Sequence, residues 1–165
     1  MTQIALWLEA VSIRIGVAVA WLGIPLIILL AALEPLVRWI GWAGDAPLSE
    51  ASTAAFFALI MSSFGYAYAA GGHVRLDILS RRFPRRANAA IELGGTLLIL
   101  LPLCTVMVID GTESAWRSLQ LGERWADTGW ALQWMVRVWV PVGFLLLMFA
   151  AISSALRAML SLSGK

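Results

Sequence analysis

The stretch ASTAAFFALIMSSFGYAYAAGG, residues 51–72, contains no Asp, Glu, Lys, Arg or His. It holds 22 residues, and a membrane-spanning helix needs roughly 20 mostly apolar residues, with a working range of about 17–25. Ser63, Ala67 and Gly71 recur in it at every fourth position. Small residues at that spacing let helices approach closely in lipid, so this stretch predicts a transmembrane helix at the centre of a bundle.

Three further charge-free stretches flank it. They hold 19, 17 and 19 residues and lie between Arg14 and Glu34, Glu92 and Asp110, and Arg137 and Arg157. The 165-residue chain is 61% hydrophobic and 13% charged, whereas a soluble domain is about 45–50% apolar and about 25% charged. We therefore predict an all-α integral membrane protein with a single domain over 1–165. Its four transmembrane helices are expected at about 15–37, 52–70, 86–110 and 131–160, with a basic loop at 71–86.

Prolines and one glycine modify these spans. Pro25 and Pro102 lie inside the first and third spans, where each removes a backbone hydrogen bond and predicts a kink. The helical pattern of the third span extends to Leu121, and Gly122 is a suitable stop.

The first 13 residues carry apolar side chains at helical spacing, among them Trp7, Leu8 and Val11. This pattern predicts a short amphipathic helix, which either lies in the membrane interface or extends the first span. The apolar run that follows is longer than the 7–15 residues of a signal-peptide core, so we expect a retained membrane helix.

Basic residues are unevenly shared between the two sides of this topology. Eight lie on the side of the two termini and the middle loop, and four lie on the other. Because an excess of basic residues marks the cytoplasmic side, both termini and the middle loop are predicted to be cytoplasmic. The opposite side gathers six tryptophans that suit an interfacial belt or a partner contact, namely Trp39, Trp42, Trp116, Trp125, Trp130 and Trp134.

The sequence gives no set of residues suited to catalysis, cofactor binding or metal binding. It has one histidine, His73, and one cysteine, Cys104, whereas two-haem subunits need several histidines and thiol oxidoreductases need cysteine pairs. No charged side chain falls at the centre of a span, where transporters that bind substrate unaided carry ionisable groups. We expect no catalysis, and we expect Arg137 to pair with Asp110 or Glu34.

The middle loop carries the most specific pattern in the chain. Residues 72–79, GHVRLDIL, followed by RRFP at 81–84, resemble the cytoplasmic loop signature of the DctQ-like small membrane subunit of tripartite ATP-independent periplasmic (TRAP) transporters. The residues PLSE at 47–50 resemble the entry to the second helix of that family, without its tryptophan. The residues PVGFLL at 141–146 resemble its fourth helix.

The resemblance implies a role in transport and no enzymatic activity. In that family a large membrane subunit carries the substrate and sodium sites, and a periplasmic binding protein delivers a substrate that is commonly an organic acid. The small subunit is a scaffold for the large one and helps to dock the binding protein at the bacterial inner membrane. By this resemblance we expect no cofactor in this chain, with sodium coupling in the large subunit.

Three groups of candidate site residues follow. The loop signature contributes Gly72, His73, Arg75 and Asp77, which either brace the assembly or form only a rigid turn. Candidates for phospholipid headgroup binding are Arg81, Arg82, Arg85 and Arg86. Candidates for docking the binding protein are Asp45, Glu113, Glu123, Arg124 and Asp127. Alternative functions are a self-sufficient small homo-oligomeric transporter and the membrane anchor of a redox complex.

Overall fold

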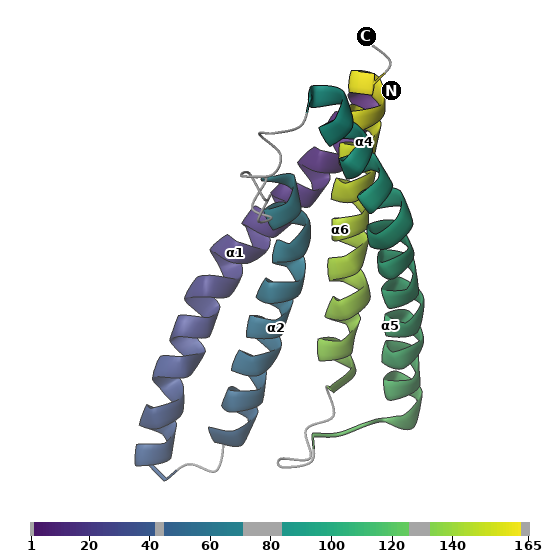
Figure 1. Ribbon diagram of the computed structural model, residues 1–165. Helices are drawn as coiled ribbons and strands as arrows, with labels where there is room; N and C mark the ends of the chain where they lie inside the picture. Colours follow the sequence, from purple (N-terminus) through teal and green to yellow (C-terminus); the bar gives the residue numbers. More distant parts are fainter. Residues whose placement is uncertain (1, 42–44, 71–83, 126–132, 163–165) are drawn as a thin grey trace.

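A computed structural model describes residues 2–41, 45–70, 84–125 and 133–162. The described residues form helices α1 (Thr2–Trp39), α2 (Asp45–Ala69), α4 (Arg85–Gly95), α5 (Leu101–Leu121) and α6 (Gln133–Leu162). A short π-helix, η1 (Thr96–Leu100), connects α4 to α5. Figure 1 shows an elongated bundle in which α1 begins and α6 ends at the same end.

The described helices include four that are long and apolar enough to cross a membrane. They are Ala5–Trp39, Leu48–Ala69, Ala87–Leu121 and Gln133–Leu160. The prediction of an all-helical protein with four membrane spans is therefore confirmed. At 35 residues each, the first and third spans are about 52 Å long, well above a hydrocarbon core of about 30 Å, so they tilt or extend beyond it.

Two helix boundaries differ from the predicted ones. Helix α2 begins at Asp45, seven residues before the predicted start, because a proline in the first turn and an acidic residue at the N-terminus both suit a helix start. The first span also begins earlier than predicted, because α1 runs without a break from Thr2 to Trp39. The first 13 residues thus extend the first span, which is one of the two arrangements expected for them.

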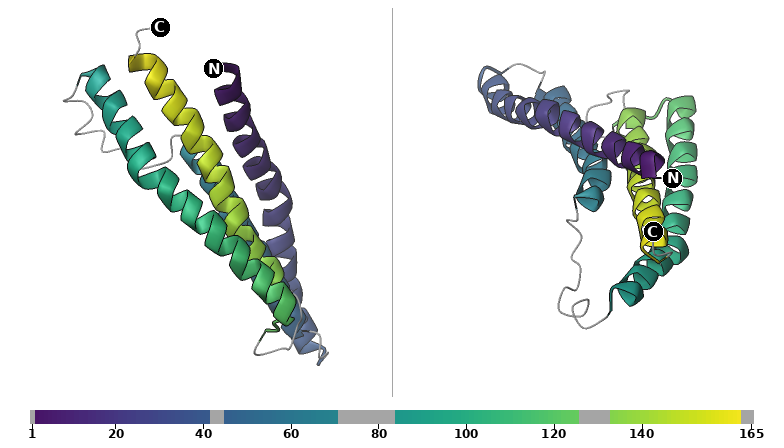
Figure 2. Two further views of the ribbon diagram at one scale, coloured as in Figure 1. Left: turned by 90° about the vertical axis from the view of Figure 1, so that its right-hand side faces the viewer. Right: turned by 90° about the horizontal axis from the view of Figure 1, so that it is seen from above.

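Helix α6 is the centre of the fold. It contacts α1, α2, α4, η1 and α5. Among the described residues, α1 and α2 form one arm, and α4, η1 and α5 form the other. The two arms make no extended contact with each other. The view from above shows these arms diverging on either side of α6 (Figure 2).

Glycines allow α2 and α6 to approach each other closely. A Cβ atom on Gly143 would lie 2.5 Å from the carbonyl oxygen of Met61, and one on Gly65 would lie 2.8 Å from that of Leu146. Both separations are too short for a real side chain, so only glycine fits at these two positions. This agrees with the prediction that the second span packs through small residues. Gly65 is not one of the three residues of the predicted stripe, which were Ser63, Ala67 and Gly71, the last of them outside the described residues.

The third span is bent where α4 meets α5. The π-helical turn of η1 precedes Pro102, which lies in the first turn of α5. A proline removes one backbone hydrogen bond and crowds the carbonyl four residues before it, and a π-turn is one of the standard ways to accommodate the disruption. The predicted kink in this span therefore takes the form of a π-helical segment.

Candidate functional site

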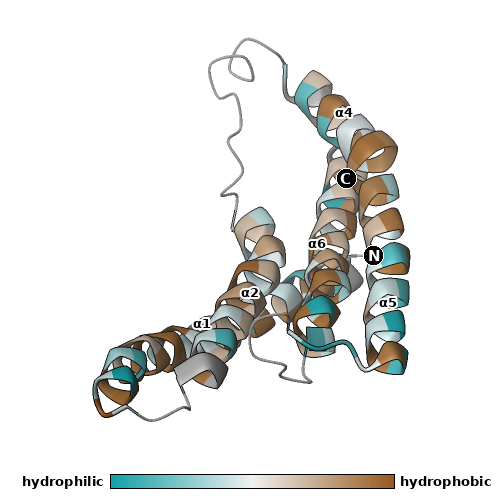
Figure 3. Ribbon diagram, turned by 90° about the horizontal axis from the view of Figure 1, so that it is seen from below, coloured by the Kyte–Doolittle hydropathy of each residue, from teal (hydrophilic) through white to brown (hydrophobic). Residues whose placement is uncertain are grey.

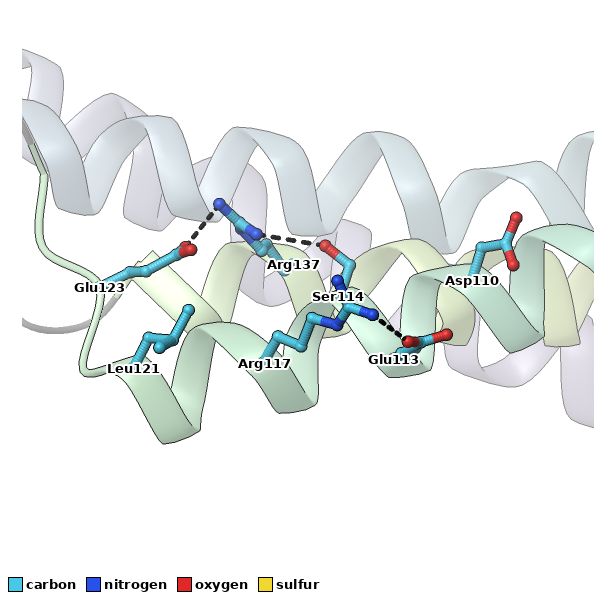
Figure 4. A pocket seen from close by; sticks show the side chains of 7 residues that line it. All are labelled: Asp110, Glu113, Ser114, Arg117, Leu121, Glu123 and Arg137. Carbon is cyan, nitrogen blue, oxygen red and sulfur yellow. Dashed lines mark hydrogen bonds and ion pairs between the residues drawn. The ribbon is translucent and has the colours of Figure 1, made fainter.

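A polar pocket lies between α5 and α6, at the end of the bundle opposite the chain termini (Figure 4). The view of the ribbon from below shows hydrophilic residues on α5 at this end (Figure 3). Its volume is about 430 Å³. The residues that line it are Asp110, Glu113, Ser114, Arg117, Leu121, Glu123 and Arg137. It gathers three carboxylates and two guanidinium groups, whereas the central part of each span carries no charged residue.

Arg137 connects the two helices at this pocket. Its Nη1 donates a hydrogen bond to Ser114 Oγ on α5 at 3.2 Å. Its Nη2 lies 2.5 Å from Glu123 Oε2, and because Oε2 has no partner in hydrogen-bond geometry, this contact is an ion pair. Both side chains are about two-thirds buried, with 35% and 28% of their surface exposed. The sequence-based prediction that Arg137 pairs with Asp110 or Glu34 is wrong, because Arg137 pairs with Glu123 and Glu34 pairs with Arg38.

The end of α5 explains why Glu123 reaches Arg137. Gly122 has a φ of +59°, the left-handed conformation in which a helix commonly ends. The amide of Glu123 then donates to the carbonyl oxygen of Ser118 at 3.1 Å, as in a Schellman motif. The chain turns sharply there and brings the carboxylate of Glu123 back towards α6. The prediction that Gly122 stops this helix is confirmed.

The outer side of the pocket is more exposed. Arg117 and Glu113 form an ion pair at 2.6 Å within α5, with 69% and 58% of their side chains exposed. Asp110 lies further along the same helix and is also exposed (Figure 4). Exposed pairs of this kind contribute little to stability, typically about 0.2–1 kcal/mol. Their charges remain available for salt-sensitive contacts with a charged partner.

Buried hydroxyl groups connect α6 to α1. Ser12 Oγ donates to the carbonyl oxygen of Leu146 at 3.0 Å, and Ser153 Oγ donates to that of Ala5 at 2.9 Å. Neither serine has any exposed surface. These reciprocal bonds fix how far α1 can slide along α6. Within the first 13 residues, the small Ala5 and Ser12 are buried, whereas Trp7 is 64% exposed.

Charged residues extend this set of contacts beyond the two serines. Glu9 on α1 and Arg157 on α6 form an ion pair at 2.7 Å. Ser154 on α6 donates a hydrogen bond to Glu92 Oε1 on α4. Sequence reasoning missed these contacts, although polar residues inside or beside apolar spans were a usable signal. They hold α1 and α4 against α6 at the end of the bundle that carries the termini.

The docking candidates are only partly described by the structure. Glu113 and Glu123 both line the pocket, but Glu123 is held by Arg137. Arg124 follows directly and is exposed. Asp45 begins α2, and its side chain and the whole of Asp127 lie outside the described residues. Sequence reasoning missed Ser114 and Arg117 as neighbours of these residues, because helix rotation decides which side chains share the pocket.

The candidate residues of the middle loop lie outside the residues, or the side chains, that the structure describes. The signature residues Gly72, His73, Arg75 and Asp77, and also Arg81 and Arg82, fall within 71–83, outside the described residues. Arg85 and Arg86 begin α4, but their side chains are likewise outside it. Among the described residues, no group of three or more His, Cys, Asp or Glu could hold a metal ion.

The fold and the contacts above define a polytopic membrane protein with four spanning helices, packed around α6 and carrying a charged pocket at one end. A sequence model of the family described as tripartite ATP-independent periplasmic transporters, DctQ component, matches residues 27–161. Since this is most of the chain, the protein belongs to that family, and the resemblance seen in the sequence is confirmed. The family is one of transporter components rather than enzymes. Comparisons with curated proteins and with solved structures gave no match.

Proposed function

We propose that this chain is the small permease subunit of a TRAP transporter. In this role it scaffolds the large substrate-translocating subunit and helps to dock the periplasmic binding protein during sodium-coupled uptake of an organic acid. The observation that carries the proposal is the family match over residues 27–161, in a chain with four membrane spans. The sodium and substrate sites belong, in this proposal, to the large subunit.

The scaffolding role is supported by the two arms around α6. Each arm presents apolar side chains away from α6, such as Trp21 on α1 and Leu98 in η1, which are 77% and 79% exposed. In a membrane such faces meet either lipid or the helices of a partner. A large membrane subunit that packs against one arm would leave the contacts of α6 with the other arm unchanged, as expected of a rigid support.

The docking role depends on which end of the bundle faces the periplasm. We propose that the protein lies in the bacterial inner membrane with both termini in the cytoplasm, because eight of twelve basic residues are on the side of the termini. The polar pocket of α5 and α6 is then periplasmic. Its exposed pair Glu113–Arg117 is placed where charges on a binding protein could meet it during association.

Exchanging the two charges of that pair tests docking separately from folding. The double variant Glu113→Arg/Arg117→Glu retains an ion pair within the helix but reverses the charge at each position. We expect uptake at limiting binding protein to fall about two- to fivefold, the effect of an exposed pair worth about 0.5–1 kcal/mol. A saturating concentration of binding protein should restore it.

A matched control is available at the same end of the bundle. Glu34 and Arg38 form an equivalent pair on α1, away from the pocket, and Glu34→Arg/Arg38→Glu should leave uptake unchanged. If uptake by the pocket variant equals that of the control at every concentration of binding protein, the pocket has no part in docking.

A further inference from the structure

A hydrogen bond joins the two arms of the bundle where α2 ends and η1 begins. The hydroxyl groups of Tyr68 on α2 and Thr96, the first residue of η1, lie 3.4 Å apart, and either group can donate. In the rest of the described chain the arms pack mainly on α6 rather than on each other. From this geometry we infer an inter-arm latch, formed by Tyr68 and Thr96, that sets the spacing of the two arms at this end of the bundle.

The latch is a polar contact in an apolar part of the chain. Both residues belong to membrane spans, and Thr96 is only 3% exposed. A hydroxyl group that is buried without a partner is unfavourable in hydrocarbon, because no water is present to replace the missing hydrogen bond. Each of the two hydroxyl groups therefore favours the arrangement in which the arms are close enough to bond.

The π-helical turn directs Thr96 towards α2. Thr96 is the buried residue of η1, whereas the three residues that follow it, Leu97, Leu98 and Ile99, are 43%, 79% and 70% exposed. The turn thus presents its polar side chain inward and its apolar side chains outward. An ordinary α-helical turn would rotate the preceding residues by about 100° relative to α5, which would carry Thr96 away from Tyr68.

Glu92 attaches the same side of this segment to the central helix. It lies four residues before Thr96, so the two side chains share one face, and its carboxylate accepts a hydrogen bond from Ser154 of α6. The segment is therefore held to α6 through Glu92 and to the other arm through Thr96. Opening the latch would let α2 and η1 move apart while both arms stay attached to α6. This inference does not depend on the proposed transport function.

The spacing of the arms can be measured in the full-length chain. Ala70→Cys at the end of α2 and Ile91→Cys on α4, both exposed positions, would carry spin labels in a Cys104→Ser background. Double electron–electron resonance in lipid nanodiscs would give the distribution of distances between the labels. We expect Tyr68→Phe and Thr96→Val, which remove one hydroxyl each, to broaden this distribution towards longer distances.

A double-mutant cycle tests whether the two hydroxyl groups act together. We expect Tyr68→Phe and Thr96→Val each to raise the unfolding equilibrium constant in mixed micelles about threefold. This corresponds to about 0.6 kcal/mol, the average contribution of a hydrogen bond between membrane helices. The double variant should have no larger effect than either single variant, because the bond is already lost in each.

Two matched controls remove hydroxyl groups that take no part in the latch. Tyr66 is on the same helix as Tyr68 and is 41% exposed, and Thr105 donates to the carbonyl oxygen of Leu101 in its own helix. Tyr66→Phe and Thr105→Val should leave the distance distribution unchanged.

Two results would overturn the inference. One is that Tyr68→Phe gives the same distance distribution as Tyr66→Phe, because the hydroxyl of Tyr68 then does not set the spacing of the arms. The other is that the effects of Tyr68→Phe and Thr96→Val on unfolding add fully in the double variant, because the two groups then act independently.

Discussion

Ser12 on α1 donates a hydrogen bond to the carbonyl oxygen of Leu146 on α6 at 3.0 Å, with the serine fully buried. Ser153 returns the same kind of bond from α6 to the carbonyl oxygen of Ala5. The two bonds are made in opposite directions across one helix pair, so each fixes the register that the other requires. The long first helix is thereby attached to the central helix by side chains that carry no charge.

Removing either hydroxyl should weaken the attachment of α1. Hydrogen bonds between membrane helices contribute about 0.6 kcal/mol on average, so we expect Ser12→Ala and Ser153→Ala each to lower the free energy of unfolding by about that amount. Unfolding in mixed micelles, followed by circular dichroism, would measure the change. Ser63→Ala is the matched control, because Ser63 donates only to the carbonyl oxygen of Ile60 in its own helix. An equal loss for Ser63→Ala would contradict this account.

Replacing Gly143 with alanine, where α2 crosses α6, should lower stability more than the two serine substitutions do. A Cβ on Gly143 would lie 2.5 Å from a backbone oxygen of Met61, and backbone cannot yield as a flexible side chain does. We expect Gly143→Ala to destabilise the protein by about 1–3 kcal/mol, the usual cost of overpacking. The same unfolding measurement applies to this variant.

Gly94→Ala is a control for which we expect the opposite change in stability. A Cβ there would meet nothing within 4 Å, and alanine is favoured over glycine in a helix interior by about 0.5–1 kcal/mol. Gly94→Ala should therefore stabilise the protein slightly. If Gly143→Ala and Gly94→Ala shift stability in the same direction, the close packing of α2 on α6 is not as described.

The π-helical turn sets the rotation of α4 relative to α5. Deleting Leu98 should convert this turn to ordinary α-helix and rotate α4 by about 100°, the angle of one residue in a helix of 3.6 residues per turn. In a Cys104→Ser background, a short bifunctional thiol reagent should cross-link Glu92→Cys to Ser154→Cys, since the native side chains are in contact. A reagent is needed because a direct disulfide requires Cβ atoms about 3.5–4.5 Å apart, closer than a contact through the end of a glutamate side chain implies. The deletion should abolish that cross-link.

Ile91 supplies the control for this cross-link. It is next to Glu92 but 61% exposed, so Ile91→Cys should not cross-link to Ser154→Cys in the full-length chain. Cross-linking of Ile91 rather than Glu92, or a Glu92 cross-link that persists after the deletion, would show that η1 does not control this orientation.

Much of the fold could be predicted because charge is so costly inside a membrane. Four charge-free runs sufficed to locate the four spans, and Gly122 was recognisable as a helix stop from its residue type alone. The start of α2 was missed because Pro47 and the acidic residues near it suit a loop as well as a first helical turn. The π-turn at 96–100 has no signature in residue type, and only the proline after it indicated a disruption.

The candidate site was less accessible to sequence reasoning. The partner of Arg137 depends on how α5 ends and on the rotation of α6, so Glu123 could not be preferred over Asp110 or Glu34 from spacing alone. The contact of Ser154 with Glu92 likewise depends on the register of helices that are far apart in sequence. Family membership was easier to predict, because a loop signature and four spans are local features of the chain.

The central claim, that this chain is the small subunit of a TRAP transporter, is tested most directly by affinity purification. The tagged full-length chain would be extracted from its native membranes in mild detergent, and its partners would be identified by mass spectrometry. We expect a stable complex with a larger, multi-span permease in about equal amounts. Recovery of the chain alone, in a form that transports substrate without any larger membrane partner, would contradict it.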